Sequence, residues 1–203
     1  MPNRRFIKGN LMKKDIKLVN ERILLRPYCP GDASTVYEAA RESVHEVGMW
    51  LPWCHAGYTL EESENWIKLC DENWGKGAAY EFAIFDSLIG RYLGGCGLNH
   101  IDPVYKTANL GYWVRSGSTR HGIATMATML LARFGLVELH LNRIEIVAAV
   151  GNSISQRVAE KSGAKREGIL RNRISINGQV HDAVVFSFIP QDFCARPPVL
   201  PGV

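Results

Sequence analysis

The sequence predicts an α/β protein of the α+β type, in which a mixed and mostly antiparallel sheet is flanked by helices. Three consecutive strand-like segments joined by turns indicate an antiparallel meander. They cover residues 80–85, 89–99 and 107–115. A helical pattern over 122–136 and an apolar run over 143–150 follow, which predicts a strand–helix–strand crossover. Asn-Gly at 177–178, between two alternating segments, predicts a closing hairpin.

One strand and one helix are expected at the start of the domain. Residues 22–26 alternate weakly between apolar and basic side chains and end at Pro27, which is typical of a short strand. The next segment, 31–44, has the pattern of a helix. Asp32 lies at its beginning, where an aspartate side chain commonly accepts hydrogen bonds from the first free amides.

Two further helices are indicated by end signals and by apolar spacing. Thr59 and Glu62 form a capping-box pattern, and the helix that follows is expected to stop at Trp74–Gly75. In the segment 122–136, apolar side chains recur at helical spacing and share one face. They are Ala124, Ala127, Leu130, Leu131 and Phe134.

The last third of the domain alternates strand, helix and hairpin. Residues 143–150 are nearly all apolar, so a strand buried on both faces is expected there. A polar helix over 152–162 ends before Gly163, which is a common C-cap residue. The hairpin strands are expected over 174–176 and 180–188.

Length and composition indicate one globular domain with short extensions. The 203 residues include 46% hydrophobic and 22% charged side chains, and no apolar run approaches the length of a membrane-spanning helix. The first residues lack the apolar core of a secretory signal, so a cytoplasmic protein is expected. We divide the chain into a basic arm (1–20), a domain (21–190) and a proline-rich tail (191–203).

The cysteines and the charge narrow the class of ligand. The five cysteines are scattered without a C-x-x-C pair, which favours buried free thiols over disulfides or a metal site. They are Cys29, Cys54, Cys70, Cys96 and Cys194. A net charge of +4 suits a small anionic ligand and is too low to predict direct binding to nucleic acid.

The segment from the strand 110–115 into the helix at 122 is the best candidate for a ligand site. A turn rich in glycine and serine leads into a helix whose first amides have no partner in the helix, which is typical of an anion site. Ile123 and Ala124 stand where a nucleotide P-loop needs Lys and Ser or Thr. The glycines at 94–97 lie in a strand pattern with no helix after them, unlike a dinucleotide site. An ordinary strand-to-helix turn is the alternative.

Residues 119–124 resemble the pyrophosphate loop of the GNAT acetyltransferase superfamily, which has the pattern Q/R-x-x-G-x-G/A. Gly122 and Ala124 match this pattern, whereas Thr119 stands at the Q/R position with Arg120 beside it. The departure affects one side-chain contact and leaves the backbone cradle in place. The resemblance implies acetyl-CoA as co-substrate, with no metal.

Other segments resemble the RimJ/RimL branch of ribosomal-protein N-terminal acetyltransferases. They are 50–53 (Trp-Leu-Pro-Trp), 110–114 (Leu-Gly-Tyr-Trp-Val) and 152–164, which is similar to the family pattern N-x-x-S…E-K-x-G-F. Ala164 replaces the aromatic residue, and Ala159 stands where many members have tyrosine. The similarity extends over 21–190.

The resemblance implies a set of residues for acetyl-CoA. The cofactor-binding residues are Trp113, Val114, Arg115, Thr119, Arg120, His121, Gly122, Ile123, Ala124, Asn152 and Ser155. Ser155 matches the serine that protonates the leaving thiolate, and Asn152 would hold the pantetheine arm or cap the helix. A solvated helix hydroxyl is the alternative for Ser155. A backbone N–H near the end of the strand 112–114 would polarise the thioester carbonyl.

A general base is harder to assign. Ile174 and Asn109 occupy the two places where related enzymes have a glutamate. We take Glu81 as the catalytic candidate, ahead of His100 and the pair His45–Glu46. Each of these side chains has a structural or solvated role as its alternative.

The acceptor is expected to be a primary amine, most simply the N-terminal α-amine of a protein. Trp50 and Trp53 would line its pocket, with packing of their loop onto the domain as the alternative. One rival function is acetylation of a small-molecule amine, and another is a non-catalytic module that binds acetyl-CoA. The expected partners are thus acetyl-CoA and an amine, without membrane or nucleic acid, and homodimerisation is left open.

Overall fold

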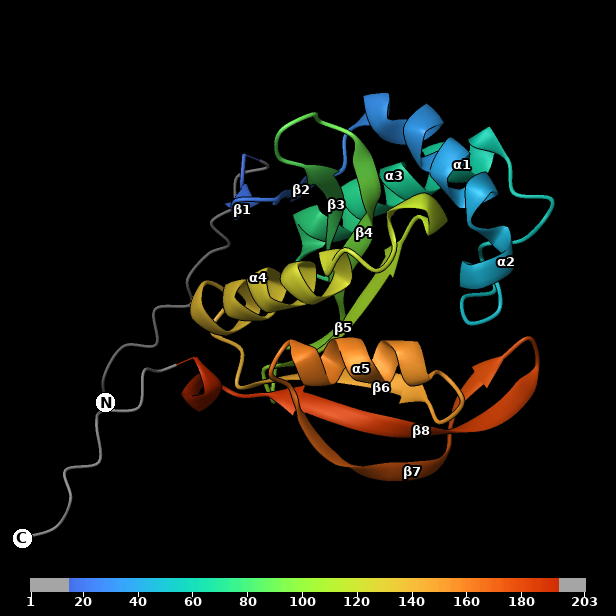
Figure 1. The fold of residues 1–203 in the computed structure, drawn as a ribbon. Coiled ribbons are helices and arrows are strands. Elements are labelled where there is room, and N and C mark those ends of the chain that lie inside the picture. The colour runs from blue at the N-terminus through green and yellow to red at the C-terminus, as the bar shows by residue number, and fades with distance from the viewer. Residues whose placement is uncertain (1–14, 194–203) are drawn as a thin grey trace, which may run out of the picture.

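The structure is a computed structural model and describes residues 15–193. Its eight-stranded sheet has the order β1-β2-β3-β4-β5-β6-β8-β7 (Figure 1). The strands are β1 (Leu18–Val19), β2 (Ile23–Pro27), β3 (Tyr80–Asp86), β4 (Tyr92–Asp102), β5 (Thr107–Val114), β6 (Arg143–Ala149), β7 (Lys165–Ile176) and β8 (Gln179–Phe188). Only β5 and β6 pair in parallel, and the other neighbours are antiparallel. The predicted mixed, mostly antiparallel sheet is confirmed.

Five α-helices and three short 3-10 turns surround this sheet within the described residues. The helices are α1 (Ala33–Glu42), α2 (Val44–Val47), α3 (Leu60–Lys76), α4 (Ile123–Val137) and α5 (Ser153–Lys161). The turns are η1 (Pro30–Asp32), η2 (Ser116–Ser118) and η3 (Pro190–Asp192). The meander, the crossover through α4 and the Asn-Gly hairpin are all as predicted.

The prediction of one continuous helix over 31–44 is wrong in its extent. The chain forms η1, then α1, and breaks at Ser43 before α2. Asp32 does not cap α1: its carboxylate accepts two hydrogen bonds from Arg26, at 2.6 and 2.7 Å, and one from the amide of Cys29, at 2.9 Å. The aspartate therefore closes the 3-10 turn and ties it to β2 through Arg26, six residues earlier in the chain.

Three other boundaries differ from prediction. The capping box at Thr59 is confirmed, but α3 continues to Lys76. β4 begins at Tyr92 because the Asp86 carboxylate accepts the amides of Leu88 and Ile89, which makes that segment a turn. β7 begins at Lys165, earlier than the predicted hairpin strand, and its extra length is mostly exposed.

The two faces of the sheet carry separate apolar clusters. Consecutive strand residues point to opposite faces, and Phe82 packs in a cluster with Ala127 and Leu131 of α4. The next residue, Ala83, packs in a cluster that contains Val36 of α1, together with residues of α3. α4 and α5 thus lie side by side on one face (Figure 1), and α1 and α3 cover the other.

The ends of the domain are only partly within the described residues. The sheet begins at Leu18, which pairs with Leu25, so the last residues of the range expected for the basic arm join β1. Residues 1–14 of the arm and 194–203 of the tail lie outside the described residues. No helix in the described part is long and apolar enough to span a membrane.

Three of the predicted buried thiols are confirmed and one is wrong. Cys54, Cys70 and Cys96 are buried and free, whereas Cys29 is exposed beside η1. Cys194 lies outside the described residues.

Candidate active site

The central strands β5 and β6 separate several residues before the predicted ligand turn begins. β5 pairs with β6 only through Thr107, Ala108 and Asn109, the last of them opposite Glu145. Beyond that point β5 continues beside β4 alone, and β6 continues beside β8. Backbone groups on the open side of 110–114 have no strand partner there, which leaves them available to a ligand.

The loop after β5 presents free amides to solvent. The amides of Arg120, His121 and Gly122 make no hydrogen bond within the described part of the chain. Arg120 and Gly122 have φ of 64° and 76°, and left-handed residues alternating with others make a backbone concavity suited to anions. Gly122 is the N-cap of α4, whose first-turn amides also lack partners in the helix.

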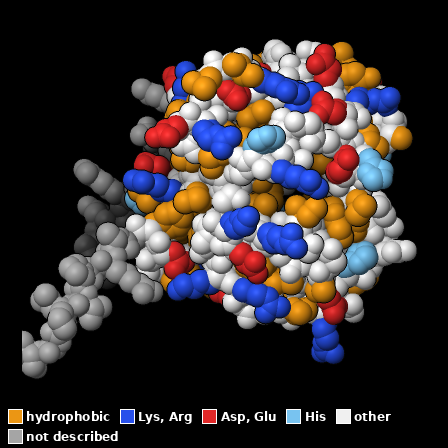
Figure 2. Space-filling model, viewed as in Figure 1, with side chains coloured by type: hydrophobic (Ala, Val, Ile, Leu, Met, Phe, Trp, Pro, Cys, Tyr) orange, Lys and Arg blue, Asp and Glu red, His pale blue; other side chains and the backbone are white. Residues whose placement is uncertain are grey.

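Thr119 and the first residues of α4 support this loop. The Thr119 hydroxyl donates to the carbonyl of Ser116 at 3.0 Å, which fixes the turn. The Ile123 side chain is buried in the core, so only its backbone faces the loop. Ala124 is half-buried. Figure 2 shows the face with α4 and α5, where Lys and Arg side chains border a shallow hollow near the centre.

Ser155 meets a side chain from the separated strand. Its Oγ lies 3.0 Å from the Oη of Tyr112, and that hydroxyl also donates to the Ser155 carbonyl at 3.0 Å. Burial raises the pKa of Tyr112 to about 12, and the bond to Ser155 lowers it in part. The phenol is therefore protonated at neutral pH, and Ser155 is bridged to β5 instead of being free in solvent.

Asn152 has the second of its two expected roles. Its Oδ1 accepts the amide of Ser155 at 3.0 Å, which caps α5 and fixes the turn that carries the serine. The sequence singled out both residues, but it missed the Tyr112 hydroxyl. The contact joins residues 43 positions apart in the sequence. It depends on the separation of β5 from β6, which no local sequence pattern predicts.

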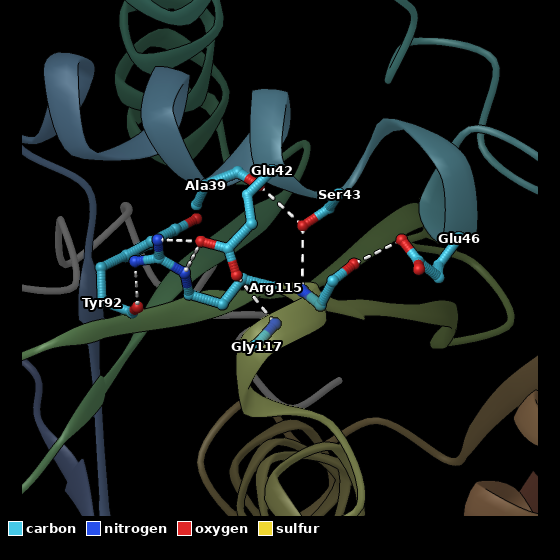
Figure 3. A network of polar contacts seen from close by, with 8 residues as sticks. Ala39, Glu42, Ser43, Glu46, Tyr92, Arg115 and Gly117 are labelled. Carbon is cyan, nitrogen blue, oxygen red and sulfur yellow. Dashed lines mark hydrogen bonds and ion pairs between the residues drawn. The ribbon is translucent and has the colours of Figure 1, made fainter.

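The Arg115 guanidinium has its partners within the protein. Its guanidinium forms an ion pair with Glu42 of α1 and also donates to the carbonyl of Tyr92 (Figure 3). Trp113 and Val114 precede it at the end of β5, both half-buried. Val114 packs against the α4 cluster and Trp113 against the opposite one.

The two predicted tryptophans lie in the loop between α2 and α3. The Trp53 ring makes an edge contact with Trp113 at 5.2 Å between centroids, and another with Tyr58. The Trp50 ring lies against Gly151, just before α5, where an added Cβ would be 3.4 Å away. Trp53 is 38% exposed. The loop packs on the domain and still presents an aromatic wall near the separated strands.

Glu81 lies on β3, two strands away from β5. Its carboxylate accepts a long hydrogen bond of 3.4 Å from Asn99, whose Oδ1 accepts from Asn109 at 2.9 Å. This line of side chains ends at the last residue of β5 that pairs with β6. Burial raises the pKa of Glu81 to about 7, and the bond from Asn99 opposes that rise.

The other base candidates are less suited to proton transfer. His45 is exposed, and the Glu46 carboxylate accepts the Ser116 hydroxyl at 2.6 Å. His100 lies exposed within β4 with φ of 49°. Among the described residues, no group of His, Cys, Asp and Glu side chains is arranged to hold a metal ion.

Comparison with known proteins finds acetyltransferases both by family and by individual relative. Residues 22–165 match the family described as acetyltransferase (GNAT) domain. A Bacillus subtilis protein named "Putative ribosomal N-acetyltransferase YdaF" is 30% identical over 177 residues, which are 86% of this chain and 95% of that protein.

Solved structures agree with this match. A Vibrio cholerae structure described as a "putative ribosomal-protein-serine acetyltransferase" is 30% identical, with a TM-score of 0.75 over 88% of this chain and all of the other. A structure of RimL, the ribosomal L7/L12 alpha-N-protein acetyltransferase, in complex with coenzyme A has a TM-score of 0.79. It is 21% identical and covers 86% of this chain and 98% of its own, so it supports the fold alone.

The Glu81 carboxyl predicts how stability depends on pH. An unfolded chain releases this proton near the ordinary pKa of 4.5, whereas the folded chain holds it up to about 7. The free energy of unfolding should therefore fall as pH rises from 4.5 to 7, by no more than about 3 kcal/mol, and stay lower above that. Glu81→Gln should unfold at higher urea concentration than the wild type at pH 8, with equal midpoints at pH 4.

Glu64→Gln, at an exposed position of α3, is the control and should leave the pH profile unchanged. Parallel urea profiles for wild type and Glu81→Gln from pH 4 to pH 8 would contradict the burial argument.

Proposed function

The chain belongs to the GNAT family of acetyltransferases, and from this premise we propose that it transfers the acetyl group of acetyl-coenzyme A to the N-terminal α-amine of a protein. One observation carries the proposal: the loop with free amides follows residues 110–114, the part of β5 that has separated from β6. A ligand with a pyrophosphate and a long arm can bind its phosphates on the loop and extend the arm between the strands. Two relatives that are 30% identical are named "Putative ribosomal N-acetyltransferase YdaF" and "putative ribosomal-protein-serine acetyltransferase", which supports a protein acceptor.

The loop residues fit the phosphates of coenzyme A. The free N–H groups at Arg120, His121 and Gly122 indicate an anion site, and the positive end of the α4 dipole adds to the attraction for an anion. A Cβ on Gly122 would meet no protein atom within 4 Å, so the space beside it is open. Thr119 and Arg115 would act by holding the loop and not by touching the phosphates.

Acetyl-coenzyme A supplies the acetyl group as a thioester, and the neutral amine attacks its carbonyl carbon while the C–S bond breaks. The N–H of Val114 would polarise the carbonyl, because the Arg115 amide donates to Leu93 of β4 and the alternation of the ladder turns the Val114 N–H to the open side. Ser155 would donate its proton to the departing sulfur. The Tyr112 hydroxyl donates to the Ser155 carbonyl and lies equally close, at 3.0 Å, to the Ser155 Oγ. When it turns its proton to that Oγ, the serine proton is free to point elsewhere, and the phenol stabilises the oxygen that loses it.

Glu81 would receive the proton that the amine loses. A base with a pKa of about 7 suits an α-amine, whose pKa near 8 leaves a usable neutral fraction at neutral pH. Asn99 and Asn109 hold its carboxylate toward β5. Since two strands separate Glu81 from the gap, the proton would pass through solvent. Trp50 and Trp53 would flank the acceptor backbone.

The acceptor class can be tested by measuring thiol release from acetyl-CoA. Peptides with free N-termini, N-terminally blocked peptides with lysine, and small amines form the panel. We expect thiol release with the free N-termini and mass spectrometry to show one acetyl group there. Release only with small amines would favour a small-molecule acetyltransferase, and coenzyme binding without release on any amine would contradict the proposal.

Ser155→Ala tests the proton donor. The variant should bind acetyl-CoA as the wild type does and lose roughly 100-fold in kcat, because general acid catalysis contributes about that much. Stopped assays at saturating substrates give kcat, and calorimetry gives the affinity. Ser153→Ala is the matched control, since its exposed side chain makes no hydrogen bond within the described structure. An unchanged kcat in Ser155→Ala would remove this role.

Gly122→Val tests the phosphate loop. Valine at φ of 76° is strained and would place its methyl groups beside the bound phosphate, so coenzyme A should bind at least about tenfold more weakly. Gly163→Val is the control for strain alone: its φ is 91°, its Cβ would also meet nothing, and it lies at the far end of α5. Calorimetry on both folded variants should show the loss only at Gly122. Equal affinities would overturn the loop assignment.

A further inference from the structure

The start of the phosphate loop is held by α1 and α2. The Glu42 carboxylate accepts the amide of Gly117 at 2.8 Å and the Nε of Arg115 at 3.0 Å (Figure 3). The Arg115 side chain is only 13% exposed, so this ion pair is partly shielded from water. One carboxylate thereby fixes both a side chain and a backbone group at the entrance to the loop.

The residues after Glu42 extend the same contact. The buried Ser43 hydroxyl accepts the amide of Ser116 at 3.0 Å and donates to the carbonyl of Ala39 at 2.7 Å. Glu46 of α2 accepts the Ser116 hydroxyl. We name Glu42, Ser43 and Glu46 together the corner clamp, because they occupy the bend between α1 and α2 and grip residues 115–117.

The corner clamp also stands at the base of the loop that carries the tryptophans. α2 ends at Val47, and Trp50 follows three residues later, with its ring against Gly151 on the other side of the separated strands. Trp53 packs on Trp113, two residues before Arg115. The phosphate loop and the tryptophan loop are therefore attached to the same bend.

We propose that Glu42 is a positioning residue that sets the phosphate loop and the acceptor loop in one geometry, so that cofactor affinity and acceptor affinity both depend on it. The inference rests on the proposed function, since it takes residues 119–124 as the phosphate site and Trp50 and Trp53 as the acceptor wall. Glu42 touches neither ligand. It acts through Arg115 and Gly117.

Electrostatics alone makes the opposite prediction for the cofactor. Removing a carboxylate near the loop and freeing the Arg115 guanidinium would make the region more positive, and an anionic ligand would then bind more tightly. Positioning predicts weaker binding despite the gain in positive charge. The sign of the change in affinity therefore separates the two.

The experiment measures coenzyme A affinity by calorimetry, and acceptor KM and kcat at saturating acetyl-CoA, in the full chain. Glu42→Ala should bind coenzyme A about tenfold more weakly, because a hydrogen bond to a charged group has a net contribution of about that size. Its acceptor KM should rise severalfold, while kcat at saturation of both substrates changes less than about twofold. Glu42→Gln keeps an oxygen for the Gly117 amide and should fall between alanine and the wild type.

Glu38→Gln is the matched control, exposed on the same helix, and should leave all three constants unchanged. If Glu42→Ala does not fold, as shown by thermal unfolding, the comparison rests on Glu42→Gln and on Glu46→Ala, which removes the acceptor of the Ser116 hydroxyl and leaves Glu42 in place. Coenzyme binding that is equal or tighter in the Glu42 variants, or an unchanged acceptor KM, would overturn the inference. Failure of the wild type itself to bind coenzyme A would instead refute the proposed function.

Discussion

The end of the parallel pairing between β5 and β6 is the constraint on which the rest of the site depends. A sheet interior normally satisfies its backbone groups through the next strand, and beyond Asn109 this chain gives up that partner. The gap is stable because other contacts cross it. Tyr112 reaches over to Ser155 on one side, and Trp50 lies against Gly151 on the other. The opening is thus bounded by side chains on either side.

The loop beside the gap has one part that is held by the protein and one part that is free to bind a ligand. Its middle, at residues 120–122, keeps its amides free, while its beginning is held by the corner clamp. A loop in which every amide was paired within the protein could not bind an anion. A loop with no amide paired would lose conformational entropy when it became ordered on binding, which weakens affinity. Fixing 115–117 and leaving 120–122 open satisfies both requirements.

Local signals explain why much of the fold was predictable from sequence. The capping box at Thr59, the apolar face of α4 and the Asn-Gly turn each act within a few residues, and each is present. Asp32 failed as a predicted helix cap because Arg26 competes for its carboxylate. Such competition depends on how strands and helices meet, which a single sequence does not show.

The site residues divide along the same line. The loop was found from its glycine- and serine-rich turn before a helix, and Ser155 and Asn152 through a family pattern; all three lie along the separated strands. Arg115 was expected to bind the cofactor, but Glu42 takes its guanidinium from 73 residues away. The Tyr112 hydroxyl and the raised pKa of Glu81 follow from contacts and burial, which arise only after the strands have assembled.

The glycine run in β4 shows how a feature that suggests no ligand still shapes the site. A Cβ on Gly97 would overlap the Glu81 carboxylate, and one on Gly95 would overlap the Tyr28 hydroxyl and approach the Trp113 indole. These glycines let side chains from neighbouring strands lie flat across β4. Because Gly97 gives the carboxylate its buried position, it is a cause of the raised pKa of Glu81. The base candidate therefore depends on the glycine at position 97 of the adjacent strand β4. Ile174 and Asn109, at the two places where related enzymes have a glutamate, supply no carboxylate.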